Sequence, residues 1–238
     1  ALMLHTSSFS HLSLVNGTGQ LVLFLFVVCL PIWRTGRMSY VDIGWPFGLV
    51  LLGIISFFLI EGYWLRSLLV SGIVVLVGLR MGLGALNMWR MGLLKIEFPR
   101  YQYQRIRWAG EGKDNTALAL QVDAISQGLA NASFLALPIF IIASNTSQEF
   151  FLLEFLGFLI WVLAFAMESI ADFQKLRFLR EMKAAGKQRQ VCSVGFWKYC
   201  RHPNYFAEWM VWNGLVVAAI PSWLSLRGFE SDVVWLFL

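Results

Sequence analysis

Long apolar segments recur along this sequence and restrict the solvent in which it can fold. An α-helix needs about 20 consecutive, mostly apolar residues to cross the hydrocarbon core of a bilayer. The segments that approach this length are residues 21–33, 43–60, 65–86, 117–143, 150–171 and 205–220. A further apolar run begins at Val233 and continues to the last residue. We therefore predict an all-α polytopic membrane bundle with six complete transmembrane helices and the start of a seventh.

The composition agrees with a membrane environment. Hydrophobic residues make up 58% of the chain and charged residues 14%, whereas soluble domains have about 25% charged residues. These values exclude a water-soluble globular domain and a disordered chain. The net charge of +5 is typical of basic loops near lipid headgroups, so we predict membrane lipids and no nucleic acid as partners. The three cysteines match no common ligand spacing and predict no metal site.

The distribution of basic residues predicts the orientation of the chain. Sixteen of the 19 Lys and Arg residues fall in the connections 34–40, 87–116 and 175–201, which the positive-inside rule places in the cytoplasm. Residues 1–20 contain no Lys, Arg, Asp or Glu. We predict a non-cytoplasmic amino-terminal tail over residues 1–20 and a single transmembrane domain over 21–238. The expected membrane is the endoplasmic reticulum in a eukaryote and the inner membrane in a bacterium.

The segment 168–212 concentrates residues suited to binding an anion. Pro203 fits the first position of the sixth predicted helix, where free backbone amides and the positive end of the helix dipole attract negative charge. Asn204 and Glu208 lie four residues apart and share one face of that helix. The same pattern fits an ordinary basic loop followed by a helix start. The residues by themselves leave both interpretations open.

Three short motifs in this segment resemble a known family. They are Ala171-Asp-Phe-Gln-Lys175, Gly195-Phe-Trp-Lys-Tyr199 and Arg201-His-Pro-Asn-Tyr205, the last followed by Glu208. Together they look like the carboxy-terminal domain of the steroid 5α-reductase family, and most closely the branch whose natural substrates are mostly unassigned. Val41-Asp-Ile-Gly-Trp45 and the region from Gly78 to Tyr101 also resemble that branch, so the likeness covers most of the chain after Ser39.

The resemblance implies a seven-helix, NADPH-dependent membrane reductase that transfers hydride to a polarised C=C bond of a lipid-like substrate of the steroid or enone type. Arginine binds phosphate through paired hydrogen bonds, which suits the phosphates of NADPH. The residues that we expect to bind this cofactor are Asp172, Lys175, Arg177, Arg180, Arg201, His202, Asn204, Tyr205 and Glu208. Reduction of an enone also needs an electrophilic donor at the carbonyl oxygen and a proton for the neighbouring carbon atom. Asp42 and Tyr101 are the candidate catalytic residues, by their positional likeness to the family.

Two alternatives to the reductase remain. An Arg-His-Pro-x-Tyr string before a final helical hairpin also marks membrane methyltransferases similar to the isoprenylcysteine and phospholipid enzymes, which use S-adenosylmethionine. The Asp-x-Gln-Lys element and the Asn-Tyr-x-x-Glu ending favour the reductase. The other alternative is a catalytically silent homologue that serves as a membrane subunit or scaffold. It is suggested by two departures from the branch, Phe98 in place of an acid after Glu97 and Ala207 in place of glycine.

Overall fold

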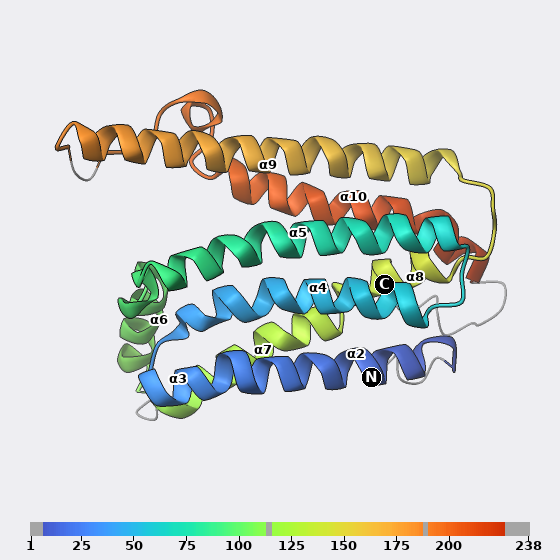
Figure 1. The fold of residues 1–238 in the computed structure, drawn as a ribbon, viewed down its shortest axis with the longest axis horizontal. Helices are drawn as coiled ribbons and strands as arrows, with labels where there is room; N and C mark the ends of the chain where they lie inside the picture. Colours follow the sequence, from blue (N-terminus) through green and yellow to red (C-terminus); the bar gives the residue numbers. More distant parts are fainter. Residues whose placement is uncertain (1–6, 113–115, 188–189, 227–238) are drawn as a thin grey trace. The chain divides into compact units, whose positions relative to one another are not determined.

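The computed structural model describes residues 7–112, 116–187 and 190–226, and within these ranges the chain forms helices and connections but no strand. The α-helices in these ranges are α2 (Ser7–Phe24), α3 (Leu30–Thr35), α4 (Val41–Leu59), α5 (Trp64–Arg90), α6 (Pro99–Gly110), α7 (Thr116–Ala132), α8 (Ala136–Ser144), α9 (Leu152–Ala184) and α10 (Pro203–Leu226) (Figure 1). Short helical turns are η1 (Leu25–Cys29), η2 (Met38–Tyr40), η3 (Leu93–Lys95) and η4 (Gly195–Lys198). The prediction of an all-α chain is confirmed for the described residues.

Among the residues that the structure describes, five helical segments are long and apolar enough to cross a membrane. They are Phe9–Thr35, Met38–Leu59, Trp64–Arg90, Ala117–Ser144 and Leu152–Ala184. These segments support a multi-pass membrane protein. The predicted sixth span coincides with α10, which is not among the five, and the predicted seventh lies outside the described residues.

The first helix begins earlier than the sequence predicted. Helix α2 starts at Ser7, so much of the predicted tail is helical. Two polar residues of the predicted tail, Asn16 and Gln20, are buried. The Asn16 amide donates a hydrogen bond to the Asn131 carbonyl over 3.2 Å, and the Gln20 amide donates to the Gly48 carbonyl over 2.8 Å. Partners in α7 and α4 thus compensate polar groups inside an apolar helix.

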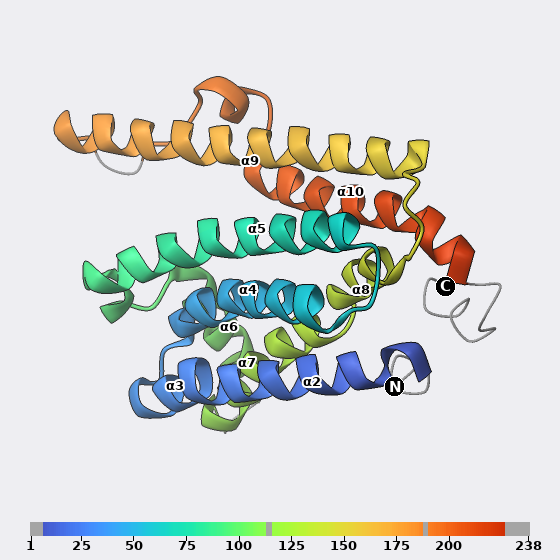
Figure 2. The ribbon, with the colours of Figure 1, turned by 45° about the vertical axis from the view of Figure 1, so that its right-hand side comes forward.

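The chain divides into two compact units, one reaching Gln148 and the other covering Glu149–Leu224. In the first unit, α4 packs along α5, α2 packs on α4 and α7, and α8 packs on α5 (Figure 2). Glycine allows α4 and α5 to approach closely, since a Cβ atom on Gly78 would lie 2.6 Å from the Pro46 carbonyl oxygen. The single transmembrane domain over residues 21–238 stays a prediction.

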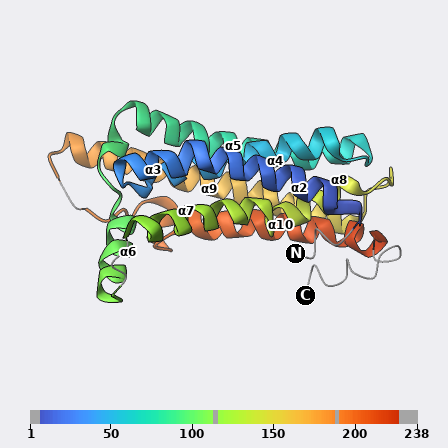
Figure 3. The ribbon, with the colours of Figure 1, turned by 90° about the horizontal axis from the view of Figure 1, so that it is seen from below.

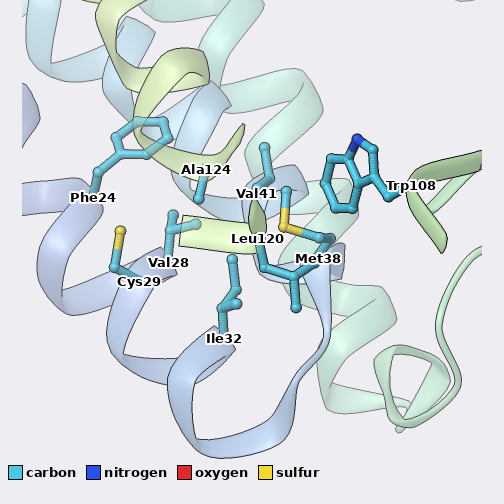
Figure 4. Packing of buried hydrophobic residues seen from close by; sticks show 9 residues of the cluster. All are labelled: Phe24, Val28, Cys29, Ile32, Met38, Val41, Trp108, Leu120 and Ala124. Atoms are coloured by element: carbon cyan, nitrogen blue, oxygen red, sulfur yellow. The ribbon is translucent and has the colours of Figure 1, made fainter. Parts of the chain in front are cut away.

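Helix α6 runs across the direction of the long helices of the first unit (Figure 3). Its buried Trp108 belongs to an apolar cluster with residues of α2, η1, α3, η2, the start of α4 and α7 (Figure 4). The cluster consists of Phe24, Val28, Cys29, Ile32, Met38, Val41, Trp108, Leu120 and Ala124. Burial of an aromatic ring of this size contributes about 1.5–3 kcal/mol, and here it holds α6 against the end of the bundle.

The second unit consists of α9, α10 and the turn η4 between them. The two helices run side by side in opposite directions (Figure 1). A Cβ atom on Gly157 would lie 2.4 Å from the Ala218 backbone nitrogen, and one on Gly214 would lie 2.8 Å from the Gly157 carbonyl oxygen. The absence of side chains at these two positions therefore lets the backbones of α9 and α10 touch.

Candidate functional site

The two predicted catalytic residues lie together in the first unit. Asp42 is in the first turn of α4, and Tyr101 is in the first turn of α6. The Tyr101 hydroxyl lies 3.4 Å from Asp42 Oδ1. Arg100 joins the pair, because its guanidinium forms an ion pair with Asp42 and lies 3.1 Å from the Tyr101 hydroxyl oxygen. A carboxylate, a guanidinium and a phenol thus share one small site.

Glu97 organises the backbone around this site. Its carboxylate accepts hydrogen bonds from the Met38 amide over 2.7 Å and from the Ser39 hydroxyl over 2.6 Å. It also forms an ion pair with Arg105 over 3.1 Å. Glu97 therefore ties the turn before α4 to α6, and the two helix starts that carry Asp42 and Tyr101 are held together.

The environment of Tyr101 keeps its hydroxyl protonated. Burial raises the pKa of Tyr101, and the negative charge of Asp42 raises it further, against a smaller opposing effect of Arg100. For Arg100, burial lowers the pKa, but the charge of Asp42 outweighs this effect and the net pKa is raised. At neutral pH the site therefore presents a neutral phenol that can donate a hydrogen bond, beside a permanent cation.

The sequence did not single out Arg100 as a site residue. Its position next to Tyr101 was the available signal, but the contact with Asp42 spans 58 positions and follows from the fold. Asp42 Oδ2 is buried and accepts no hydrogen bond from the residues that the structure describes. This oxygen can accept a hydrogen bond from a donor group on a ligand.

In the second unit, Asn204 at the start of α10 contacts Asp172 in α9. The Asn204 side-chain amide donates a hydrogen bond to Asp172 Oδ1 over 3.0 Å. The amide oxygen of Asn204 is buried and accepts no hydrogen bond within the described ranges. Buried polar atoms usually have partners, so this oxygen marks a position where a ligand can donate a hydrogen bond.

Two of the motifs found in the sequence pack against each other beside this contact. Gln174 of α9 accepts a hydrogen bond from the Phe196 amide over 2.9 Å, and the Trp197 indole donates to the Ala171 carbonyl over 2.8 Å. The Lys175 ammonium lies 4.4 Å from the centre of the Trp197 ring, a favourable cation–π distance. The motif at 171–175 therefore fixes the turn that precedes α10.

The predicted arginines differ in their partners. Arg177 forms an ion pair with Glu181 over 2.8 Å. Both side chains are exposed, so this pair is worth little and a phosphate can displace it. Arg180 and Arg201 are also exposed, and neither forms an ion pair with another described residue. These two guanidinium groups are available for an anion.

The remaining predicted cofactor residues surround the start of α10. The rings of His202 and Tyr205 stack with centroids 5.3 Å apart, and both residues are exposed. Glu208 is half-buried one turn further along the helix. Ala207 is completely buried, so the methyl group that distinguishes it from glycine is accommodated inside the packing. Among the described residues, no group of three or more His, Cys, Asp or Glu side chains could hold a metal ion.

The fold and these two clusters define an all-helical, multi-pass membrane protein with polar sites at helix starts. The family described as protein of unknown function, DUF1295, matches residues 23–236, and the chain belongs to that family. No curated protein and no solved structure matches the chain.

Proposed function

We propose that the protein is a membrane-embedded, NADPH-dependent reductase that acts on a polarised C=C bond of a lipid-like substrate. The single observation that carries this proposal is the Asp172–Asn204 pair with its unsatisfied amide oxygen. A carboxylate and an amide oxygen suit ribose hydroxyls and a carboxamide, which are the polar groups of a nicotinamide dinucleotide. The resemblance of the three motifs to the steroid 5α-reductase family points to the same chemistry.

The residues of the second unit provide the groups that a dinucleotide phosphate needs. Arg180 and Arg201 would bind phosphate oxygens, and Arg177 would exchange its exposed partner Glu181 for them. The backbone amides of the first turn of α10, after Pro203, add neutral donors at the positive end of the helix dipole. Lys175, His202, Tyr205 and Glu208 complete the set of proposed cofactor-binding residues. Bound NADPH would supply the hydride.

In the first unit, Tyr101 would donate a hydrogen bond and then a proton to the substrate oxygen or carbon. Its raised pKa keeps the proton on the phenol until an acceptor is placed beside it. The neighbouring Arg100 would stabilise negative charge that develops on the oxygen. Asp42 would orient both side chains, since it contacts each of them.

We also propose that α10 is a further membrane span and that the basic end of the first unit faces the cytoplasm. Arg34, Arg37, Arg90 and Lys95 belong to the ends of α3 and α5 and to their connections, and these ends lie at the same side of the unit (Figure 3). Concentration of basic residues at one end is the pattern that the positive-inside rule describes.

The test is thermal stabilisation of the purified protein in detergent by NADPH and, separately, by S-adenosylmethionine. We expect NADPH to raise the melting temperature and S-adenosylmethionine to leave it unchanged. Asn204→Ala should weaken the NADPH effect by about tenfold or more in affinity, because a hydrogen bond to a buried partner is lost. Asn213→Ala, on the same helix, is the matched control.

Three outcomes contradict this proposal in different ways. Stabilisation by S-adenosylmethionine alone would indicate a methyltransferase. A protein that folds but responds to neither compound would indicate a silent homologue. Equal NADPH affinity in Asn204→Ala and Asn213→Ala would place the cofactor elsewhere in the chain.

A further inference from the structure

A groove at the basic end of the first unit has no role in the proposed reduction. Its volume is about 570 Å³, and it lies between the turn that follows α3 and the end of α5. The residues that line it are Arg37, Tyr40, Trp89, Arg90, Met91, Gly92, Leu94 and Lys95. None of them belongs to the residues that we assigned to the cofactor or to proton donation.

The groove is lined by positive charge without compensating negative charge. Arg37, Arg90 and Lys95 contribute three cations, and no lining residue is acidic. Across the described residues, neither Arg90 nor Lys95 forms an ion pair. Glu97 is the one acid in the segment 91–98, and its carboxylate is already bound by Arg105 and by the Ser39 hydroxyl. The groove therefore lacks an anion of its own.

One of the three cations is held in place by the backbone. Arg37 donates a hydrogen bond through Nη1 to the Leu94 carbonyl over 2.9 Å, and Leu94 is almost completely buried. This bond uses one of the five donors of the guanidinium, so the others stay available in a fixed orientation. A positioned arginine fork with two further cations matches the charge and geometry of a phosphate group.

The surroundings of the groove are apolar and exposed, which suits the boundary between membrane and water. Trp89 is 49% exposed, Met91 59%, Leu93 52% and Ile96 74%. Exposed Trp and aliphatic side chains beside basic residues are typical of the interfacial region, where the ring and the apolar chains contact lipid while the cations reach headgroups. Tyr40 adds a second aromatic side chain to the lining.

We propose that this groove binds a phosphate group, with Arg37, Arg90 and Lys95 as its ligands. The exposed apolar rim indicates that the phosphate is carried by an anionic phospholipid, whose headgroup would occupy the groove while its chains lie along Leu93 and Ile96. A soluble phosphate compound shares the same chemistry and is distinguished by the experiment. This inference does not depend on the proposed reductase activity.

The test compares three probes on the whole protein, purified in a neutral detergent at low salt. Short-chain phosphatidylglycerol, phosphatidylcholine of the same chain length and inorganic phosphate are titrated separately, and thermal stabilisation is followed. We expect phosphatidylglycerol to stabilise the protein and phosphatidylcholine to have little effect. Added salt should weaken the stabilisation, because the exposed cations are screened.

Variants assign the effect to the groove. Arg90→Gln combined with Lys95→Gln should lower the affinity for phosphatidylglycerol by at least about tenfold, since two charged hydrogen bonds are removed. Lys183→Gln combined with Lys187→Gln removes the same charge elsewhere and should leave the affinity unchanged. Arg90→Lys combined with Lys95→Arg keeps both charges on exposed positions and should retain binding.

Each result either supports or overturns the inference. Stabilisation by inorganic phosphate that disappears in the Arg90→Gln, Lys95→Gln variant supports the groove and identifies a soluble phosphate compound as its ligand. Equal affinity for phosphatidylglycerol in the two neutralised variants overturns it. Equal stabilisation by phosphatidylcholine and phosphatidylglycerol also overturns it, because the groove would then lack the predicted preference for a headgroup with net negative charge.

Discussion

The side-chain amide of Asn204 donates a hydrogen bond to the Asp172 carboxylate over 3.0 Å, across 32 positions of the chain. The bond joins the start of α10 to α9, and it orients the Asn204 amide so that its oxygen points away from the carboxylate. A hydrogen bond to a charged partner contributes about 1.5–3 kcal/mol. This contact is therefore part of the folding energy of the second unit as well as of the proposed cofactor site.

Asn204→Asp should destabilise the protein at neutral pH, and the lost stability should return at low pH. The substitution places two carboxylates within hydrogen-bond distance, where two like charges repel each other. At low pH the carboxylates become protonated and the repulsion disappears, so the stability of the variant should rise as the pH falls. The measurement is the melting temperature of Asn204→Asp as a function of pH.

Asn213→Asp is the matched control for this prediction. The Asn213 amide donates to the Trp209 carbonyl over 2.7 Å, so this substitution also removes a donated hydrogen bond. It does not bring two carboxylates together. If the two variants lost the same stability at pH 7 and showed the same pH dependence, the Asp172–Asn204 contact would be refuted.

Tyr101 should remain protonated where ordinary tyrosines ionise. Burial, followed by the charge of Asp42, raises its pKa above the usual value of about 10. The folded state thus favours the protonated phenol, so the stabilisation is complete below pH ~10 and is lost as the pH rises through the folded pKa. The ultraviolet difference spectrum between wild type and Tyr101→Phe, recorded during an alkaline titration, measures this ionisation.

Asp42→Asn tests whether the charge of Asp42 contributes to the raised pKa of Tyr101. Removal of the carboxylate charge should lower the pKa of Tyr101 relative to wild type, while burial still keeps it raised. A phenolate signal from Tyr101 near pH ~10 in the wild-type protein would show that the side chain is not buried as the structure has it.

Gly195→Ala should disturb the turn η4 more than an equivalent substitution elsewhere. Gly195 has a φ of +55°, and a Cβ atom there would lie 2.3 Å from the Gln174 side chain. The left-handed backbone alone costs a non-glycine residue about 1–2 kcal/mol, and displacement of Gln174 breaks its hydrogen bond to Phe196. Melting temperature and limited proteolysis of the η4 segment measure the loss.

Gly186→Ala is the control that separates the backbone strain at Gly195 from the steric clash with Gln174. Gly186 has a φ of +67°, and a Cβ atom added there would meet no atom within 4 Å, so its substitution carries the backbone cost without the steric one. We expect a clearly smaller loss of stability in Gly186→Ala. Equal losses would show that the contact between Gln174 and η4 contributes nothing.

Gly48→Ala should destabilise the junction of α2, α4 and α7. A Cβ atom on Gly48 would lie 2.3 Å from Asn131 Nδ2 and 2.5 Å from Gln20 Oε1. Both side chains are buried and hydrogen-bonded, so they have little room to move. Overpacking of this kind costs about 1–3 kcal/mol, measured as a lower melting temperature in detergent.

Gly72→Ala, in α5, is the control for the junction. No atom lies within 4 Å of a Cβ atom at Gly72, and alanine is favoured over glycine in a helix by about 1 kcal/mol. We expect unchanged or slightly higher stability. A similar loss in Gly48→Ala and Gly72→Ala would mean that the polar junction is not tightly packed.

The sequence by itself determined the all-helical membrane class and the approximate positions of most long helices. A helix in lipid makes all its backbone hydrogen bonds within its own segment. The hydropathy of consecutive residues is therefore enough to locate it. The same local logic placed a helix start at Pro203, where α10 begins. It placed the start of the first helix too late. The burial of Asn16 and Gln20 in that helix depends on Asn131 and Gly48, which are far away in the sequence.

The tertiary structure decided which polar residues meet. Asp42 and Tyr101 were chosen by likeness to a family, but their contact, and the arrival of Arg100 between them, result from the way Glu97 joins α6 to the start of α4. The docking of η4 on α9 likewise depends on the positive φ of Gly195 and on Gln174. These contacts join positions far apart in the chain, so only the packing of the helices brings the groups within hydrogen-bond distance.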